Sequence, residues 1–351
     1  MRAPHHTSRR RLAIGAASLL TAVAGLAATG SASATAAAVT YGAVNNDPAY
    51  VQVYVNNVEN LETADAFCPG DWQDLVYYMK TYETSPDLFL VQQVSDQAEL
   101  NTLVGMMTDQ LAGVYTGVLA VAQPEEMNSP CGAEKAHQTN AIIWRTGRFD
   151  LVSTATWQSD AQTSTGGCAN NSQDRTINLR ARMWDKIAQK YVTAASIHWP
   201  TGAMDGPACA AENAREAAEN VATGGGSLLI WGGDANVSDQ SGGTWRSWYT
   251  ATNGDLGGVH GYRDVMYDNC AETTSDPATI KACLQDNWTS GSGNRIDFLF
   301  ARRGTGGMPF VGAEHTVTFD EGDAADIAVT GDDRTDRNYS DHRAVRARIH
   351  Y

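Results

Sequence analysis

Arg295-Ile-Asp-Phe-Leu-Phe300 is an apolar run with one carboxylate, Asp297, in its interior. Aromatic and branched residues of this kind predict a buried strand. A carboxylate buried there without a cation or an imidazole partner would be unfavourable. The natural partner is His342, in Tyr339-Ser-Asp-His-Arg343, just before the last apolar run of the chain. Neighbouring strand residues face opposite sides, so Asp341 and His342 can serve one site only from a strand end or a loop.

Two further segments end in polar residues. Leu228-Leu-Ile-Trp-Gly-Gly-Asp-Ala-Asn236 is an apolar strand that runs into two glycines and then Asp234 and Asn236. The glycines let a ligand approach the backbone closely, although an ordinary Asx-turn gives the same pattern. In Ala195-Ser-Ile-His-Trp-Pro200 a predicted strand ends at His198, a polar residue in an apolar setting. A histidine in such a place is more often structural.

The remaining pattern predicts strands with helices between them. Residues 50–58 alternate and are rich in β-branched residues, which predicts a strand ending at Asn57, by itself an ordinary turn residue. Further strands are expected at 87–94, 139–145, 149–157, 175–184, 190–198 and 227–232. Helices are expected at 70–83, 96–111, 210–222 and 243–251, with loop and strand beyond. This order favours two sheets packed face to face with helices outside.

Residues 1–34 are expected to be a leader. Ser8-Arg-Arg-Arg-Leu12 precedes an alanine-rich apolar run and then Ala32-Ser-Ala34, the order of a signal peptide and its cleavage site. The arginines are typical of twin-arginine export. A membrane anchor is the alternative, but the short run and its small, polar tail favour export. We therefore expect a secreted bacterial protein, extracellular and without stable membrane association. Residues 35–47 would form a short linker and 48–351 one domain.

The cysteines agree with export. Six cysteines in a secreted chain indicate three disulfides. Cys270 and Cys283 bracket a short acidic and polar segment, expected to be a loop, and should pair. Six cysteines allow 15 pairings, so sequence alone leaves the connectivity open; Cys168 with Cys209 and Cys68 with Cys131 are the other candidate pairs. No Cys-x-x-Cys or Cys/His spacing indicates a zinc module.

The chain is strongly acidic. Residues 1–34 contain four arginines and no acidic residue, so the remainder has 21 basic and 40 acidic residues, a net charge of −19. Such a surface disfavours tight, general nucleic-acid binding through a basic face. A nuclease that cleaves and releases is compatible if cations bridge to phosphate, and so are small phosphodiesters. The acid-rich stretch 320–336 is expected to be a solvated loop, with a structural Ca²⁺ as the alternative. A monomer is expected.

Together the motifs resemble the endonuclease/exonuclease/phosphatase superfamily, which includes pancreatic-type deoxyribonucleases, abasic-site endonucleases, sphingomyelinases and inositol phosphatases. In order they are Asn57-Val-Glu-Asn-Leu61, Leu90-Val-Gln-Gln-Val94, Ile197-His198, Gly232-Gly-Asp-Ala-Asn236, Arg295 to Phe300 and Ser340-Asp-His-Arg343. Each motif alone is a weak signal, but six in this order are a strong one for the superfamily. Residues 228–249 look closest to its secreted deoxyribonuclease branch. The resemblance spans about residues 48–351. It implies an α/β (α+β) four-layer sandwich of two packed mixed β-sheets flanked by helices.

The resemblance also implies roles for five catalytic residues. His342 would stabilise the phosphorane-like transition state, and Asp297 would pair with it and orient it. His198 would contact the scissile phosphate or protonate near it. Asp234 would orient or deprotonate the attacking water, and Asn236 would fix its geometry.

Asn57, Gln93 and Asp341 would hold a divalent metal, Mg²⁺ or alternatively Ca²⁺ or Mn²⁺. Here the sequence departs from the family, which usually has Gln-Glu where this chain has Gln92-Gln93. An amide oxygen can bind Mg²⁺ but carries no formal charge, so metal affinity should fall. Tyr115 is a candidate for the family's phosphate-contacting tyrosine.

The expected function is that of a secreted, divalent-metal-dependent phosphodiesterase, a nuclease acting on DNA or RNA with little sequence specificity. A sphingomyelinase-like or small-molecule phosphodiesterase is the first alternative, because fold does not fix the substrate. The second is a catalytically weakened binding protein on the same scaffold, because of Gln93.

Overall fold

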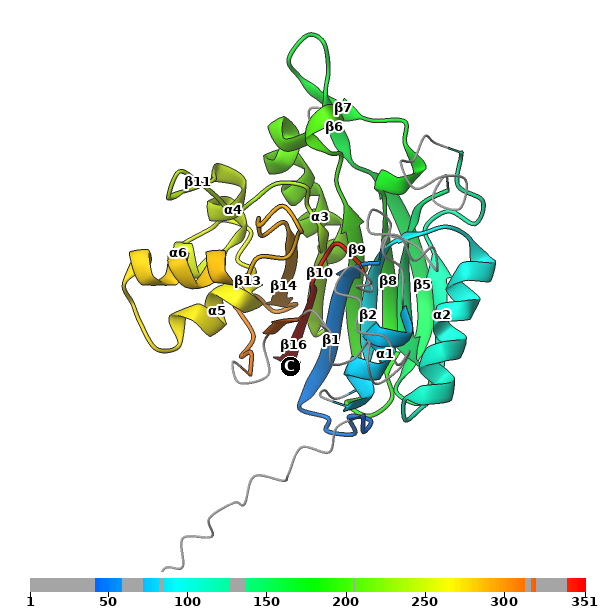
Figure 1. Ribbon diagram of the computed structural model, residues 1–351. Coiled ribbons are helices and arrows are strands. Elements are labelled where there is room, and N and C mark those ends of the chain that lie inside the picture. Colours follow the sequence, from blue (N-terminus) through cyan, green and yellow to red (C-terminus); the bar gives the residue numbers. More distant parts are fainter. Residues whose placement is uncertain are drawn as a thin grey trace, which may run out of the picture. The chain divides into compact units, whose positions relative to one another are not determined.

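Two six-stranded β-sheets carry the domain (Figure 1). The computed structural model describes residues 42–58, 72–81, 85–126, 137–204, 206–312, 317–319 and 340–351. The first sheet has the order β15-β16-β1-β2-β4-β3 and the second β13-β14-β10-β9-β8-β5. Both sheets are mixed, since β1 and β2 run parallel in one and β9 and β10 in the other, whereas their other neighbours are antiparallel.

The predicted strands are present with bounds close to the expected ones, whereas the strand at 115–119 was not predicted. The first sheet contains β1 (Tyr50–Asn57), β2 (Leu88–Val94), β3 (Tyr115–Leu119), β4 (Thr139–Arg145), β15 (Val317–Phe319) and β16 (Ala344–His350). The second contains β5 (Phe149–Gln158), β8 (Ile177–Asp185), β9 (Lys190–His198), β10 (Leu228–Asp234), β13 (Arg263–Asp264) and β14 (Asp297–Arg303). Two short ribbons complete the strands, β6 (Asp160–Gln162) with β7 (Cys168–Asn170) and β11 (Gln240–Ser241) with β12 (Thr244–Trp245).

Six α-helices accompany the sheets in the described part of the chain. They are α1 (Trp72–Thr81), α2 (Gln97–Gln110), α3 (Ala210–Gly224), α4 (Ser247–Thr252), α5 (Val265–Ala271) and α6 (Pro277–Asp286). Asp96 caps α2, because its side chain accepts a hydrogen bond from the backbone N–H of Glu99. None of the helices in the described ranges is long and apolar enough to cross a membrane.

Three buried clusters define the layers. The cluster between the sheets includes Val53, Leu90, Ile142, Ile230, Leu299 and Val345, which come from both sheets. A second lies between the first sheet and α1 and α2, and includes Tyr54, Phe89, Trp72, Leu75, Leu100 and Leu103. A third joins the second sheet to α3 and α4 through Trp231, Phe300, Ala217, Val221 and Trp248. The order is helices, sheet, sheet, helices, so the predicted four-layer sandwich is confirmed.

Two predicted disulfides are present. Cys270 pairs with Cys283 and Cys168 pairs with Cys209, whereas Cys68 and Cys131 lie outside the described residues, as does the acid-rich stretch 320–336. The expected loop between Cys270 and Cys283 is confirmed for residues 272–276 and was wrong for the residues on either side of them. The two cysteines lie in the helices α5 and α6, each of which begins after an aspartate that caps it, Asp264 and Asp276.

The chain packs on the domain from residue 42 onward, earlier than the expected start at 48. Asn45 is buried and donates a hydrogen bond from Nδ2 to Asp87 Oδ2 over 2.7 Å. Asp87 in turn forms ion pairs with Arg145 and Arg148, so a fully buried charge is matched by two guanidinium groups. The other end of the chain meets the same region, since Tyr351 N donates to the carbonyl oxygen of Ala49 over 3.0 Å.

Candidate active site

Three polar side chains meet in one row of the second sheet. Asp234, the last residue of β10, is paired in register with His198 at the end of β9 and with Asp297 at the start of β14. Directly opposed residues on neighbouring strands project from the same face of a sheet. All three are buried. The ends of three strands therefore present one imidazole and two carboxylates together.

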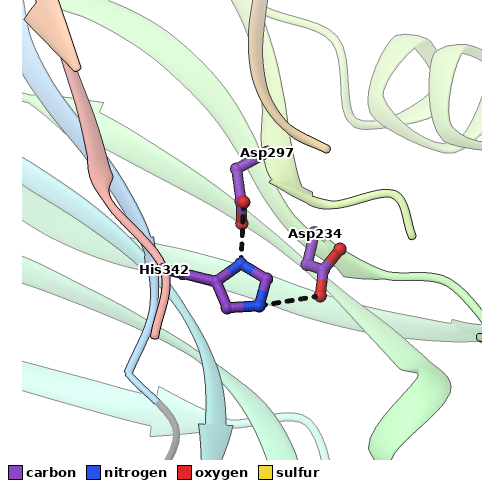
Figure 2. A group of neighbouring side chains, drawn as sticks. All are labelled: Asp234, Asp297 and His342. Carbon is purple, nitrogen blue, oxygen red and sulfur yellow. Dashed lines mark hydrogen bonds and ion pairs between the residues drawn. The ribbon is translucent and has the colours of Figure 1, made fainter. Parts of the chain in front are cut away.

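The first sheet contributes the groups that face this row. Asn57, the last residue of β1, donates a hydrogen bond from Nδ2 to Asp234 Oδ2 over 3.1 Å. His342 lies just before β16. Its Nδ1 is 2.8 Å from Asp297 Oδ2, and its Nε2 is 3.9 Å from Asp234 Oδ2. Figure 2 shows the ring between the two carboxylates, one at each nitrogen. The candidate site thus joins strand ends of both sheets.

Backbone contacts on both sides hold this pair in place. His342 N donates to Ser340 Oγ over 3.0 Å, and Asn56 Nδ2 donates to the His342 carbonyl oxygen over 3.1 Å. On the other side, Asp297 N donates to Thr289 Oγ1 over 2.9 Å. Ser340 Oγ is also 2.5 Å from the Asn57 carbonyl oxygen, to which it donates. Anchors of this kind fix the imidazole and the carboxylate at hydrogen-bonding distance before any substrate arrives.

Three neighbouring carboxylates favour a protonated His342. Burial opposes the charged imidazole, but Asp297, Asp234 and Asp341 outweigh it and raise the pKa of His342 well above its usual value. Burial also raises the pKa of Asp234 to about 7, with His342 acting against this rise and Asp297 adding to it. An imidazolium therefore lies beside a carboxyl group that can exchange a proton near neutral pH.

His198 has the opposite electrostatics. Its Nε2 is 3.6 Å from Asp234 Oδ2, and its backbone N–H donates to Asn178 Oδ1 over 3.0 Å. Burial, the positive charge of Arg175 and that of His342 lower the pKa of His198 well below its usual value. At neutral pH the site therefore holds one charged and one neutral imidazole, each with its Nε2 near Asp234 Oδ2. Titratable groups pushed apart in this way are typical of acid–base sites.

Solved structures with a similar arrangement cover most of this chain. The mannosyl-6-phosphatase of Bacteroides thetaiotaomicron matches it with a TM-score of 0.52 at 18% identity, over 86% of this chain and 100% of that one. D. rerio TDP2, humanized by 14 mutations, matches with a TM-score of 0.52 at 14% identity, over 86% and 99%. An endonuclease/exonuclease/phosphatase from Bacteroides vulgatus matches with a TM-score of 0.51 at 16% identity, over 86% and 98%. The chain has the endonuclease/exonuclease/phosphatase fold.

At these low sequence identities the comparison shows a shared fold and does not show a shared activity. No family model matches the sequence, and no curated protein matches it significantly. The substrates of the neighbours differ, since one is a sugar-phosphate phosphatase and D. rerio TDP2 has also been solved with a single strand DNA product. In this fold the chemistry has to be argued from the site itself.

Asn236 lies in the turn that follows Asp234. Its backbone N–H donates to Asp234 Oδ1 over 2.7 Å, which closes an Asx-turn, and its backbone has a φ of 50°. Its side-chain Nδ2 donates to the Trp199 carbonyl oxygen over 2.8 Å. The Asx-turn is therefore present, and it orients the Asp234 carboxylate, whereas the Asn236 amide is used by the backbone.

The two glycines before Asp234 permit close strand packing. A Cβ on Gly233, whose φ is 146°, would lie 1.9 Å from the Ile197 carbonyl oxygen. A Cβ on Gly232 would lie 2.5 Å from the Phe298 carbonyl oxygen. Both positions therefore need glycine because neighbouring strands pack against them. The sequence suggested another reason, that glycine lets a ligand approach the backbone.

The candidate metal ligands offer a set of oxygen donors. Gln93 has a φ of 63° at an irregularity of β2, and its buried Oε1 accepts no hydrogen bond from the described residues. Asp341 has a side chain that is 48% exposed, with Oδ1 3.8 Å from His342 Nε2. Asn57 is hydrogen-bonded to Asp234 Oδ2, as described above. An unpartnered amide oxygen and a carboxylate are both oxygen donors, which suit a hard cation, although the amide supplies less charge than a glutamate would.

Asp234, Asp297 and His342 also offer ligand atoms that lie within 4.8 Å of one another. His342 Nδ1 is already hydrogen-bonded to Asp297 Oδ2. We therefore interpret Asp297 and His342 as a pair that shares a proton, and not as two ligands of a metal ion.

Sequence reasoning missed Arg175 and the residues that orient the histidines. Arg175 lies in a 3₁₀ turn, Asp174–Thr176, and its charge acts on both His198 and Asp234. The pattern gave no signal for it, because the segment was expected to be a strand from residue 175. Tyr115 is buried against α2, and its hydroxyl lies 3.5 Å from the Ala112 carbonyl oxygen, to which it donates. It therefore packs in the core and is not among the groups described at the site.

Proposed function

We propose that this protein is a secreted, divalent-metal-dependent phosphodiesterase, and most specifically a nuclease with little sequence preference. The observation that carries the proposal is the buried His342 imidazole between Asp297 and Asp234, with neutral His198 also beside Asp234. In-line hydrolysis of a phosphodiester needs a group that accepts a proton from water and donors that stabilise charge on phosphorus.

The residues can divide this work. Asp234, with a pKa of about 7, takes the proton of the attacking water, while the Asx-turn of Asn236 holds the carboxylate in position. His342 as imidazolium donates from Nε2 to a phosphoryl oxygen, and Asp297 at Nδ1 maintains its charge and ring orientation. Neutral His198 donates a hydrogen bond to the phosphate.

Asn57, Gln93 and Asp341 are the residues we propose to hold the cation, with Mg²⁺ as the first candidate and Ca²⁺ or Mn²⁺ as alternatives. When bound there, a divalent cation supplies charge neutralisation at phosphorus. The site needs it, because three carboxylates and one imidazolium would otherwise repel an anionic substrate. Arg175 adds a second positive charge from the chain itself.

Two observations bear on the substrate. The DNA product bound to D. rerio TDP2 makes nucleic acid the first candidate. The net charge of −19 outside the leader and the fold of a mannosyl-6-phosphatase favour a small phosphoester as the second. We further propose that residues 1–34 are a signal peptide and that the mature protein is an extracellular monomer. The two disulfides support an oxidising compartment.

The test is cleavage of plasmid and RNA by the purified mature protein with Mg²⁺, Ca²⁺, Mn²⁺ or EDTA. We compare wild type with His198→Ala and Gln93→Glu, and use Gln97→Glu on α2 as a control for the added charge. Metal-dependent cleavage that is lost in His198→Ala supports the nuclease. Gln93→Glu should then reach half-maximal activity at an approximately tenfold lower metal concentration, because a carboxylate replaces a neutral oxygen.

Other outcomes separate the alternatives. If wild type cleaves nothing and Gln93→Glu cleaves, the natural protein is a scaffold with a weakened metal site. If neither cleaves nucleic acid, sphingomyelin and small phosphodiesters are assayed next. Failure of all of these substrates with all three metals rejects the proposed hydrolase.

A further inference from the structure

A second acidic cluster lies between the β6–β7 ribbon and helix α3. It consists of Asp160 at the start of β6 and of Glu212 and Glu216 on α3, and it shares no residue with the candidate active site. Glu212 and Glu216 are one turn apart, so both lie on the same face of the helix. One carboxylate oxygen from each of the three residues lies within 4.8 Å of the others.

Two of the carboxylates are unsatisfied. Asp160 is only 5% exposed, and its buried Oδ1 has no hydrogen-bond partner among the described residues. The buried Oε2 of Glu216 has none there either. Buried carboxylate oxygens without partners are costly, and solvation by a cation is one of the few ways to offset that cost.

The backbone around Asp160 is fixed before any ligand binds. Asp160 N donates to Asn213 Oδ1 over 2.7 Å, and Asn213 Nδ2 donates back to the Asp160 carbonyl oxygen over 3.0 Å. The Cys168–Cys209 disulfide ties β7 to the residue before α3. The ribbon and the helix are thus held together at two points, which lowers the ordering cost of binding between them.

Charge at the cluster is only partly compensated. Arg215 forms ion pairs with Glu212 and with Glu219, so one guanidinium is shared between the cluster and a residue outside it. Burial, and then the neighbouring Asp160 and Glu212, raise the pKa of Glu216 to about 7. Burial and the neighbouring Glu212 raise the pKa of Asp160 as well, whereas the hydrogen bond from Arg215 lowers that of Glu212.

We propose that Asp160, Glu212 and Glu216 form a structural Ca²⁺ site that clamps the β6–β7 ribbon onto α3. The donors are all oxygen, which selects a hard cation. Two oxygens bound to one Ca²⁺ ion are at most about 5 Å apart, because each lies about 2.4 Å from it, and this matches the spacing of the cluster. Ca²⁺ also tolerates an irregular set completed by water, whereas Mg²⁺ demands near-octahedral geometry.

The clamp lies next to residues that support His198. Ser159, directly before Asp160, accepts a hydrogen bond from Asn178 Nδ2 at its Oγ over 2.7 Å, and Asn178 Oδ1 accepts from His198 N. Bound Ca²⁺ would therefore stabilise the segment that positions this histidine.

The experiment uses the full mature chain, freed of metal with EDTA and dialysed. Calorimetric titration with Ca²⁺ should show binding with a Kd of roughly 0.1–1 mM, the range of extracellular calcium modules. Saturating Ca²⁺ should raise the melting temperature by roughly 5 °C. Asp160→Asn and Glu216→Gln should each weaken this binding at least tenfold. Glu219→Gln is the matched control, since it makes the same charge change on the same helix outside the cluster.

Two measurements keep the outcome decisive. In EDTA, Glu216→Gln should melt at the same temperature as wild type or higher, because it removes repulsion among carboxylates, and this shows that the variant folds. Asp341→Asn, at the other candidate metal site, should retain the calcium-induced rise. The proposal is overturned if Ca²⁺ does not stabilise wild type, or if it stabilises Asp160→Asn and Glu216→Gln as much as wild type.

Discussion

Replacing Asp297 by asparagine isolates the charge that the site places behind His342. Asn has nearly the same shape as Asp, so the packing at the start of β14 should persist. The change removes the charged hydrogen bond between Asp297 Oδ2 and His342 Nδ1, which spans 2.8 Å in a buried environment. It also removes the largest of the carboxylate contributions that keep His342 protonated.

The expected loss follows from the strength of that bond. A hydrogen bond to a charged group contributes about 1.5–3 kcal/mol, and about 1.4 kcal/mol corresponds to a tenfold change in rate. If the bond acts mainly in the transition state, kcat/KM should fall roughly 10- to 150-fold. Stability should fall less than when an arginine pair is broken, because His342 can release its proton once residue 297 is neutral.

The assay is metal-dependent phosphodiester cleavage, paired with thermal unfolding of the same samples. Asp239→Asn is the control, because Asp239 is equally buried but is paired with Arg295 in a different network. Breaking that pair should reduce stability by about 1–3 kcal/mol and leave kcat/KM unchanged below the melting transition. Asp297→Asn should thus lose mainly activity, and Asp239→Asn should lose mainly stability.

The reasoning is refuted if Asp297→Asn retains kcat/KM within twofold of wild type while remaining folded. It is equally refuted if Asp239→Asn loses as much activity as Asp297→Asn, because a general effect of buried charge would then explain both.

Three further predictions concern the scaffold. Gly233→Ala should cost about 3 kcal/mol or more in denaturant unfolding, since its Cβ would meet the Ile197 carbonyl oxygen at 1.9 Å; Gly202→Ala, with nothing within 4 Å, should be neutral, and equal midpoints for both would contradict this. Replacing Cys270 and Cys283 by serine should lower the unfolding free energy by about 3 kcal/mol through the lost loop constraint, and a wild-type denaturation curve would argue against it. Burial raises the pKa of Asp268 to about 6, although Arg263 opposes the rise. The folded state then holds the proton that the unfolded chain releases near pH 4, so this residue's contribution falls as pH rises from about 4 to about 6. Asp268→Asn should gain stability relative to wild type across that window, and parallel pH–stability curves would exclude this effect.

The sequence predicted the layers because both sheets bury nearly continuous apolar strands. The strands that carry Asn57, His198 and Asp234 have both faces covered, and such runs stand out from their polar ends. The same contrast between an apolar run and one polar residue predicted that Asp297 is buried and pairs with His342. Short helices were harder to predict. Helix α5 has seven residues and α6 has ten, and each offers few apolar positions from which a helical period could be recognised.

Features that depend on contacts distant in sequence gave no signal. Arg175 approaches the histidines from a 3₁₀ turn, and the left-handed backbone of Gln93 appears only once β2 and β4 pair with a shifted register. Asp160 and Glu216 are far apart in the chain and share no motif. Their proximity is set by the way the ribbon packs on α3, which no local pattern encodes.

The antiparallel pairing of β1 with β16 has a practical consequence for rewiring the chain. Tyr50 lies opposite His350, whereas Asn57 and His342 lie at the far end of the same two strands, where the candidate catalytic groups gather. A peptide could therefore join residue 351 to residue 42, which retains the buried Asn45, at the end of β16 remote from the reaction centre. New ends could then be opened in the exposed turn at 165–167, giving a circular permutant with an undisturbed site. A surface anchor or fusion partner attached at Tyr351 would likewise leave substrate access open.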